Sequence, residues 1–160
     1  MDRTAERGSV PALVASVLGI GYMGRGGGSV AAAVMALLWL VAGLHSAPHG
    51  AYMAALVGIF LIGAWASARM EQGWGKDSQL VVVDEFAGMA LALFALPAGW
   101  PTALLAFLLF RAFDIVKPFG IARLERLPSG AGVMADDLLA GVYANLIMQV
   151  VVRSNPWTWL

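Results

Sequence analysis

Acidic residues interrupt the long apolar runs of this sequence, and they are the side chains best placed to do chemistry. The five carboxylates within or beside these runs belong to Asp84, Glu85, Asp114, Asp136 and Asp137. Each would cost roughly 2.5–3.5 kcal/mol at the centre of a membrane, and less near its edge, unless it were paired, hydrated or metal-bound. Carboxylates that are tolerated in such surroundings are therefore candidate ligands for a cation.

Two basic residues flank one of these acids. The spacing of Arg111, Asp114 and Lys117 places all three on one broad face of a helix, which Pro118 is expected to end. Taken alone, this pattern also fits a simple ion network at a helix end, with basic side chains reaching toward water. Set against the five carboxylates, the two cations leave a net negative charge, which a divalent cation or bound protons must balance.

The available donor atoms indicate which cation would suit. The chain has no cysteine, and its two histidines, His45 and His49, are far in sequence from the acids. Oxygen donors without thiolate or imidazole favour a hard ion such as Mg²⁺. Arg111 and Lys117 could then contact a phosphate that the metal also binds. The sequence thus predicts a site for a phosphate group.

The overall composition indicates a membrane protein. Of the 160 residues, 60% are hydrophobic and 12% are charged, whereas a soluble domain is about half apolar and about a quarter charged. Ten Lys and Arg balance ten Asp and Glu, so no basic excess suggests nucleic acid as a partner. The lack of cysteine excludes disulfides and cysteine-based phosphatase chemistry. We expect one membrane-embedded domain over residues 1–160.

Five apolar runs approach the roughly 17–25 residues that a helix needs to cross a bilayer. They cover residues 29–44, 51–68, 81–97, 100–116 and 133–152. Residues 9–24 are also apolar, but Pro11 and nearby glycines favour an interfacial or re-entrant segment over a continuous span. The expected fold class is all-α: a polytopic membrane helix bundle with about five spans and this additional N-terminal segment.

The basic residues set the expected orientation of the bundle. If the N-terminus lies inside, all Lys and Arg fall on the cytoplasmic side except Arg153, as the positive-inside rule requires. The span ends that carry Asp84, Asp114 and Asp137 then share that side, close to the lipid headgroups. This arrangement predicts a polar pocket at the cytoplasmic end. The pair Asp136–Asp137 alone would fit equally well as acids at a helix start, where the helix dipole favours them.

Three blocks of the sequence resemble the bacterial phosphatidylglycerophosphatase A family. They read VVVDEFAGMALALFALP, FRAFDIVKPFGI and GAGVMADDLLAGVYAN. A weaker likeness lies in GGGSVAAA, where Gly28 and Ser29 match a Gly-Ser-x-Ala-Ala pattern. The family usually has Pro-Gly-Thr before this Gly-Ser, whereas this chain has Gly24, Arg25 and Gly26 near that position and lacks the Thr hydroxyl.

The resemblance implies a Mg²⁺-dependent lipid phosphatase of the bacterial inner membrane, multi-pass, with its active site on the cytoplasmic side. Its phospholipid substrate would be phosphatidylglycerophosphate, hydrolysed to phosphatidylglycerol and inorganic phosphate. The residues expected to hold the metal are Asp84, Glu85, Asp136 and Asp137. The residues expected to bind the substrate are Arg111, Lys117, Gly28 and Ser29. Asp114 would orient these groups or ligate the metal.

Several mechanisms and functions are compatible with the sequence. Either a carboxylate or a metal-activated water could attack phosphorus. A cation carrier or channel could use intramembrane acids as an ion path, although it would need polar groups across the whole bilayer. A non-catalytic membrane scaffold could use the same charges only to set its topology.

Overall fold

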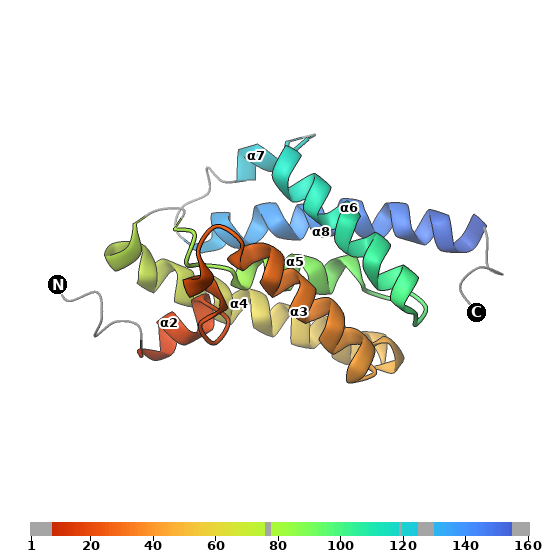
Figure 1. The fold of residues 1–160 in the computed structure, drawn as a ribbon, viewed down its shortest axis with the longest axis horizontal. Helices are drawn as coiled ribbons and strands as arrows, with labels where there is room; N and C mark the ends of the chain where they lie inside the picture. Colours follow the sequence, from red (N-terminus) through yellow and green to blue (C-terminus); the bar gives the residue numbers. More distant parts are fainter. Residues whose placement is uncertain (1–7, 76–77, 119, 125–129, 155–160) are drawn as a thin grey trace.

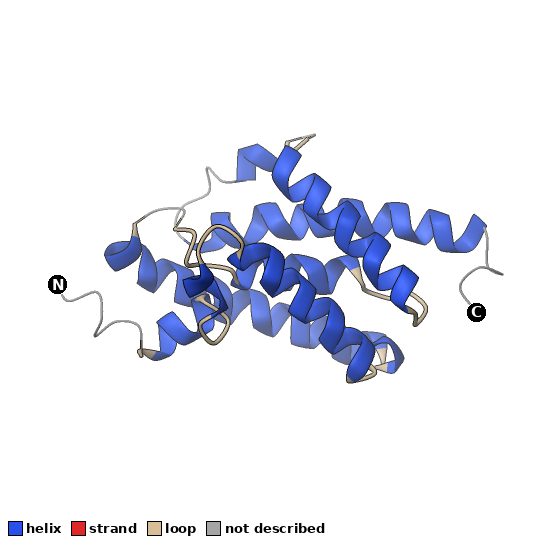
Figure 2. Ribbon diagram, in the orientation of Figure 1, coloured by secondary structure: helices blue, strands red, loops and turns tan. Residues whose placement is uncertain are grey.

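A computed structural model of the chain describes residues 8–75, 78–118, 120–124 and 130–154. These residues form helices joined by turns and loops, with no strand among them (Figure 2). The α-helices are α2 (Val10–Ala15), α3 (Gly27–Val41), α4 (His49–Trp74), α5 (Val83–Ala92), α6 (Trp100–Val116), α7 (Ile121–Leu124) and α8 (Gly130–Ser154), and the 3₁₀ turns are η1 (Ile20–Met23) and η2 (Leu44–Ser46). The all-helical fold class is confirmed.

The helix ends gather the charged residues at one end of the bundle, which we call the acidic end. Helices α3, α5 and α8 begin there and α4 and α6 finish there (Figure 1). The acidic end therefore holds Asp84, Asp114 and Asp137, whereas Arg153 belongs to the last turn of α8 at the other end. The basic residues Arg3, Arg7, Lys76 and Arg126, on which the expected orientation also depends, lie outside the described residues.

Helix α5 lies at the centre of the bundle, between α3 and α8 (Figure 1). Its crossing with α8 is close because glycine faces glycine. A Cβ added to Gly141 would lie 2.4 Å from the carbonyl oxygen of Gly88, and one added to Gly88 would lie 2.6 Å from the carbonyl oxygen of Asp137. Small residues allow such close approach of helices in membrane proteins. Asp84 and Asp137 stand one helical turn from this crossing, so it sets how near they come.

Only some of the expected spans are long helices. Helices α4 and α8, with 26 and 25 residues, are long and apolar enough to cross a membrane by length and composition. Helix α3 is apolar but has 15 residues. Helix α5 has 10 residues, which corresponds to about 15 Å at 1.5 Å per residue. That is half of a hydrocarbon core of about 30 Å, so α5 is too short to cross alone.

The expected helix over residues 81–97 is thus shortened at both ends. Asn145 donates hydrogen bonds to the carbonyl oxygens of Ala92 and Phe94, at 3.0 and 2.8 Å. Side-chain donors that bind these carbonyls take the place of the next helical turn. Ala95 then adopts a left-handed backbone conformation, with φ of 53°. By contrast, α6 covers the expected residues 100–116 and ends before Pro118, as predicted.

The N-terminal segment does not form one continuous helix. Helix α2 has six residues and ends at Ala15 with Ser16 as its C-cap, and Val17, Leu18 and Gly19 then have positive φ. The segment contacts the start of α5, because the backbone N–H of Val82 donates to the carbonyl oxygen of Ala15 at 2.8 Å. The interruption agrees with the expectation that residues 9–24 are not a continuous span.

Candidate active site

Three helices position the five predicted carboxylates. Asp84 and Glu85 lie in the first turn of α5, where the helix dipole favours acids. Asp114 lies in the last turn of α6. Asp136 and Asp137 lie in the second turn of α8, because that helix begins at Gly130. The dipole effect falls off within the first turn, so it does not explain this buried pair.

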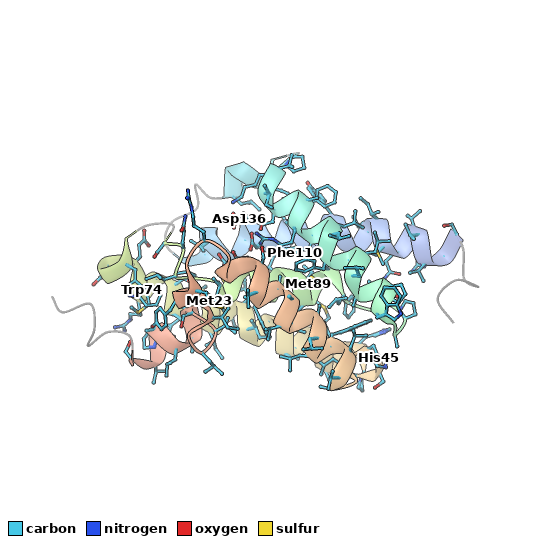
Figure 3. All side chains as sticks on the ribbon, in the orientation of Figure 1. Met23, His45, Trp74, Met89, Phe110 and Asp136 are labelled. Atoms are coloured by element: carbon cyan, nitrogen blue, oxygen red, sulfur yellow. The ribbon has the colours of Figure 1, made fainter. Side chains whose placement is uncertain are left out.

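All five carboxylates line one cavity at the acidic end. The cavity has a volume of about 200 Å³ and is lined by Ser78, Gln79, Val81, Asp84, Glu85, Asp114, Lys117, Val133, Asp136 and Asp137. Figure 3 shows Asp136 at this end and Phe110 and Met89, both fully buried, deeper in the bundle. The expected convergence of the acidic span ends on one polar pocket is therefore seen in the structure.

Three of the carboxylates could share one cation. Asp84, Glu85 and Asp137 each offer an oxygen, and these oxygens all lie within 4.8 Å of one another. Among the described side chains, Asp84 Oδ1, Glu85 Oε2 and Asp137 Oδ2 are buried atoms without a hydrogen-bond partner. Carboxylates that lie this close together repel one another unless a cation or protons neutralise them. An all-oxygen donor set of this kind fits Mg²⁺.

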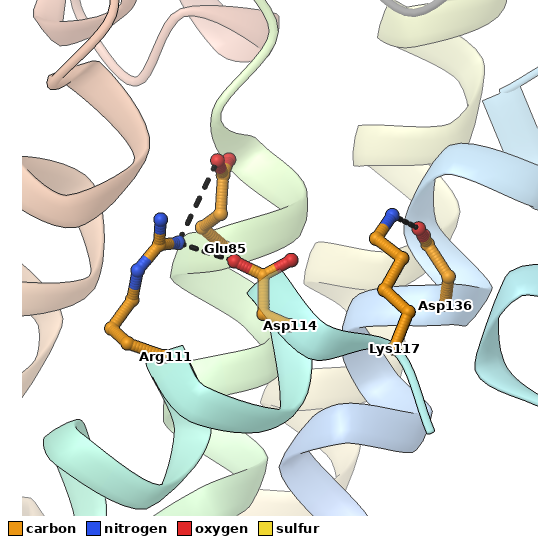
Figure 4. A network of polar contacts seen from close by, with 5 residues as sticks. All are labelled: Glu85, Arg111, Asp114, Lys117 and Asp136. Carbon is orange, nitrogen blue, oxygen red and sulfur yellow. Dashed lines mark hydrogen bonds and ion pairs between the residues drawn. The ribbon is translucent and has the colours of Figure 1, made fainter. Parts of the chain in front are cut away.

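The two basic residues reach the same group of acids from α6. Arg111 Nη1 donates to Asp114 Oδ2 and lies 4.0 Å from Glu85 Oε1 (Figure 4). Lys117 Nζ donates to Asp136 Oδ2 at 2.6 Å. The structure therefore pairs Asp136 with Lys117, while the three other predicted metal ligands form the close oxygen group.

Lys117 has an unusual backbone conformation that follows from its place in the chain. It caps the C-terminus of α6 with φ of 48° and ψ of 51°, in the left-handed region. Its N–H donates to the carbonyl oxygen of Phe113 at 2.8 Å, and Pro118 follows and cannot continue the helix. A strained residue that carries a charged side chain into a cavity is a common feature of functional sites.

Gly28 and Ser29, which were expected to bind substrate, lie in the first turn of α3. They are not among the residues that line the cavity. Gly28 instead faces Glu85: a Cβ added to Gly28 would lie 1.8 Å from Glu85 Oε1. Gly28 therefore contacts Glu85, a residue of the cavity wall, and does not line the cavity itself.

Four residues of the cavity wall were not predicted from the sequence. Ser78, Gln79 and Val81 belong to the loop before α5, and Val133 lies one turn before Asp137 on α8. The only signal in the sequence was their position just ahead of the acidic pairs.

The known proteins that are similar to this chain include three that are named as phosphatases. A protein of Bacteroides thetaiotaomicron named "Putative phosphatidylinositol-3-phosphatase" is 38% identical over 149 residues, which cover 88% of this chain and 92% of that protein. The phosphatidylglycerophosphatase A of Haemophilus influenzae is 41% identical over 92 residues, 56% of each chain. That of Escherichia coli is 37% identical over 82 residues, covering 50% of this chain and 48% of that protein.

No solved structure gives a significant match to this chain. The sequence model of one family, described as phosphatidylglycerophosphatase A, matches residues 13–152 and so includes every residue of the candidate site. The match extends from the N-terminal segment to the last turns of α8. The chain therefore belongs to the phosphatidylglycerophosphatase A family and is a phosphatase.

Proposed function

We propose that this phosphatase hydrolyses phosphatidylglycerophosphate to phosphatidylglycerol and inorganic phosphate, with Mg²⁺ as its cofactor. The observation that carries the proposal is the carboxylate group of Asp84, Glu85 and Asp137, which each offer an oxygen within 4.8 Å of the others and each keep a buried oxygen without a partner, beside two basic side chains. Such a site combines ligands for a hard cation with donors for a phosphate.

Asp84, Glu85 and Asp137 would hold the metal. Bound there, Mg²⁺ would supply positive charge to the phosphoryl oxygens as negative charge develops on them. Asp136 lines the same cavity, but its carboxylate is held 2.6 Å from Lys117 Nζ. We therefore assign Asp136 to positioning Lys117 and the three-residue group to the metal.

Arg111 and Lys117 would bind the substrate phosphate. Both are paired with carboxylates in the described structure, and a phosphate entering the cavity would compete for the same N–H groups. A guanidinium can bind phosphate through two parallel hydrogen bonds, and an ammonium contributes a compact charge. Arg111 is not among the residues that line the cavity, and Asp114 would keep its guanidinium beside Glu85, which does line it. The attacking group would be either a carboxylate or a water.

The site would lie at headgroup depth on the cytoplasmic side of the bacterial inner membrane. We propose that α4, α6 and α8 cross the bilayer, that α3 does so together with the turn η2 that follows it, and that α5 is a half-span. A half-span within a membrane is tolerated where it is buried in protein, and α5 has buried residues along most of its length. Arg25 and Arg69, near helix ends on the acidic side, agree with a cytoplasmic location for that end.

The interior below the cavity favours a phosphatase over a cation carrier. Met89, Leu93 and Met148 are fully buried along α5 and α8 beyond the carboxylates. A carrier would need polar groups along this path. An ion held by the carboxylates would thus lie at the end where we propose that a lipid headgroup reaches the site.

A second candidate substrate follows from the name of the Bacteroides relative, which is similar over nearly its whole length. A phosphatidylinositol 3-phosphate also presents a phosphomonoester on a lipid headgroup, so the same metal and basic residues would serve it. The two candidates differ in the size of the group that carries the phosphate.

Phosphate release from defined lipids tests the proposal. The full-length chain in detergent micelles, supplied with Mg²⁺, should release inorganic phosphate from phosphatidylglycerophosphate faster than from phosphatidylinositol 3-phosphate or phosphatidic acid. Chelation of the metal should abolish release, and fresh Mg²⁺ should restore it. A folded preparation that releases phosphate equally well without divalent metal would contradict the cofactor assignment. A clear preference for the inositol lipid would favour the second substrate.

A further inference from the structure

The first turn of α3 has no side chain at the point where Glu85 approaches it. A Cβ built on Gly28 would lie 1.8 Å from Glu85 Oε1, 2.5 Å from its Cδ and 3.2 Å from its Cγ. Real Cβ atoms do not approach other atoms this closely, so the glutamate occupies the volume that any other residue at position 28 would fill.

Glu85 is held between α3 on one side and α6 on the other. Arg111 Nη1 of α6 lies 4.0 Å from the same oxygen, Oε1, that faces Gly28. The N-terminus of α3 carries a partial positive charge that also favours a carboxylate there. The second oxygen, Oε2, is the buried atom without a partner. Contacts to Oε1 thus fix the carboxylate and leave Oε2 without a protein partner, in a residue that could share a cation with Asp84 and Asp137.

We infer that Gly28 is a positioning residue for Glu85. Its missing side chain lets the glutamate lie against the first turn of α3, and this placement brings Glu85 within 4.8 Å of Asp84 and Asp137 oxygens. The inference rests on the proposed function in that it takes Glu85 as a metal ligand. It replaces the expectation that Gly28 contacts the substrate directly.

The substitution Gly28→Ala tests this role in the full-length protein. The added Cβ should push the Glu85 carboxylate away from its seat and lower the affinity for Mn²⁺, measured by electron paramagnetic resonance, by about 10–100-fold, as for other losses of support around metal ligands. Gly58→Ala is the matched control, because Gly58 is also helical and a Cβ there meets nothing within 4 Å. That control should bind Mn²⁺ like the parent protein.

A shortened acid provides the decisive comparison. Glu85→Asp removes one methylene and should clear the space that the new Cβ needs. Gly28→Ala should therefore cost little further Mn²⁺ affinity when it is added to Glu85→Asp. An equal loss in both backgrounds would overturn the inference. An unchanged Mn²⁺ affinity with a raised KM for lipid substrate would overturn it as well, and would return Gly28 to direct substrate contact.

Metal-free measurements separate this inference from the proposed function. The unfolding midpoints of the parent, both single variants and the double variant, without divalent metal, report the contact between positions 28 and 85 directly. Non-additive midpoints support the contact, and additive midpoints overturn it. If Asp84→Asn and Asp137→Asn bind Mn²⁺ as the parent does, the metal assignment fails whatever the midpoints show.

Discussion

The two ends of helix α5 differ in whether their buried polar groups have hydrogen-bond partners. At its C-terminal end, side chains of neighbouring helices complete the hydrogen bonds of its last carbonyl groups. Asn145 donates to Ala92 and Phe94, and Gln149 donates to Phe94 at 3.2 Å. Tyr52 of α4 donates to the carbonyl oxygen of Ala90 at 2.8 Å. These contacts hold the end of a short helix inside the bundle.

At the N-terminal end of α5, buried polar atoms are left without hydrogen-bond partners. Asp84, Glu85 and Asp137 each keep a buried oxygen without a partner, although the helices there are packed closely enough for glycine to face glycine. Buried polar groups in proteins are normally paired, and an unpaired one costs free energy. The C-terminal end is therefore completed by hydrogen bonds within the fold, while the N-terminal end leaves buried oxygens that the proposed metal would satisfy.

The largest expected effect comes from neutralising one acid of the three-oxygen group. Asp84→Asn should lower the rate of phosphate release by about 10²–10³-fold, in the range that follows loss of a group stabilising the transition state. The same change should raise the metal-free unfolding midpoint, because it relieves repulsion among the three clustered carboxylates. Phosphate release and thermal unfolding of the same preparation measure both effects.

A fall in activity together with a rise in the unfolding midpoint would distinguish a catalytic site from a cluster that only stabilises the fold. If Asp84→Asn lowered both together, the carboxylates would be serving the fold, and the contrast between the ends of α5 would fail. Asp136→Asn provides a comparison at the cavity edge. It breaks the pair with Lys117 and should therefore lower activity less than Asp84→Asn while leaving the three-oxygen group intact.

A smaller effect is expected from widening the helix crossing next to the site. In Gly141→Ala the added Cβ would lie 2.4 Å from the carbonyl oxygen of Gly88, a backbone atom that moves only with its helix. Helices α5 and α8 should separate, and the activity should fall by about 10–100-fold through a weaker metal site. The Mg²⁺ concentration for half-maximal phosphate release should rise in parallel.

The control for the crossing is Gly63→Ala on α4. Its new Cβ would meet the flexible end of the Met134 side chain at 2.9 Å and Val83 Cγ2 at 3.2 Å, and these side-chain atoms can move aside without shifting a helix. This variant should keep near-normal Mg²⁺ dependence. Equal losses in the two variants would mean that general packing, and not the α5–α8 crossing, controls the site.

The sequence predicted the helices wherever apolar periodicity and a strong stop coincided. Residues 100–116 became α6 without change, because Pro118 cannot continue the helix and Lys117 caps it. The run over 81–97 looked like a comparable span, yet α5 ends at Ala92. The stop depends on Asn145, more than fifty residues away, and a long-range hydrogen bond leaves no local pattern in the run that it shortens.

The acidic residues of the site were foreseeable because a charge within an apolar run is costly and is rarely kept without a function. Which of these acids pairs with a basic residue and which joins the three-oxygen group could not be predicted. Asp136 and Asp137 are adjacent in sequence, but one side chain pairs with Lys117 and the other joins Asp84 and Glu85. Neighbouring residues on a helix point about 100° apart, and only the placement of α6 decides which of the two meets the lysine. The contact between Gly28 and Glu85 likewise depends on how α3 and α5 pack.

The smallest expected effect lies at the other end of α5. Tyr52→Phe removes one hydroxyl and leaves the ring, which stacks at an angle against Phe94 with centroids 5.7 Å apart. The Ala90 carbonyl loses its side-chain donor, at a cost of about 0.6 kcal/mol, the average for such bonds in membrane proteins, or up to about 1.7 kcal/mol. The rate of phosphate release per folded molecule and its Mg²⁺ dependence should not change, because more than one turn of α5 separates this bond at Ala90 from Asp84 and Glu85. Chemical unfolding and steady-state phosphate release measure the two quantities. A change in Mg²⁺ affinity here, without loss of fold, would show that the two ends of α5 are coupled through the helix and that the division between a structural end and a functional end is too simple.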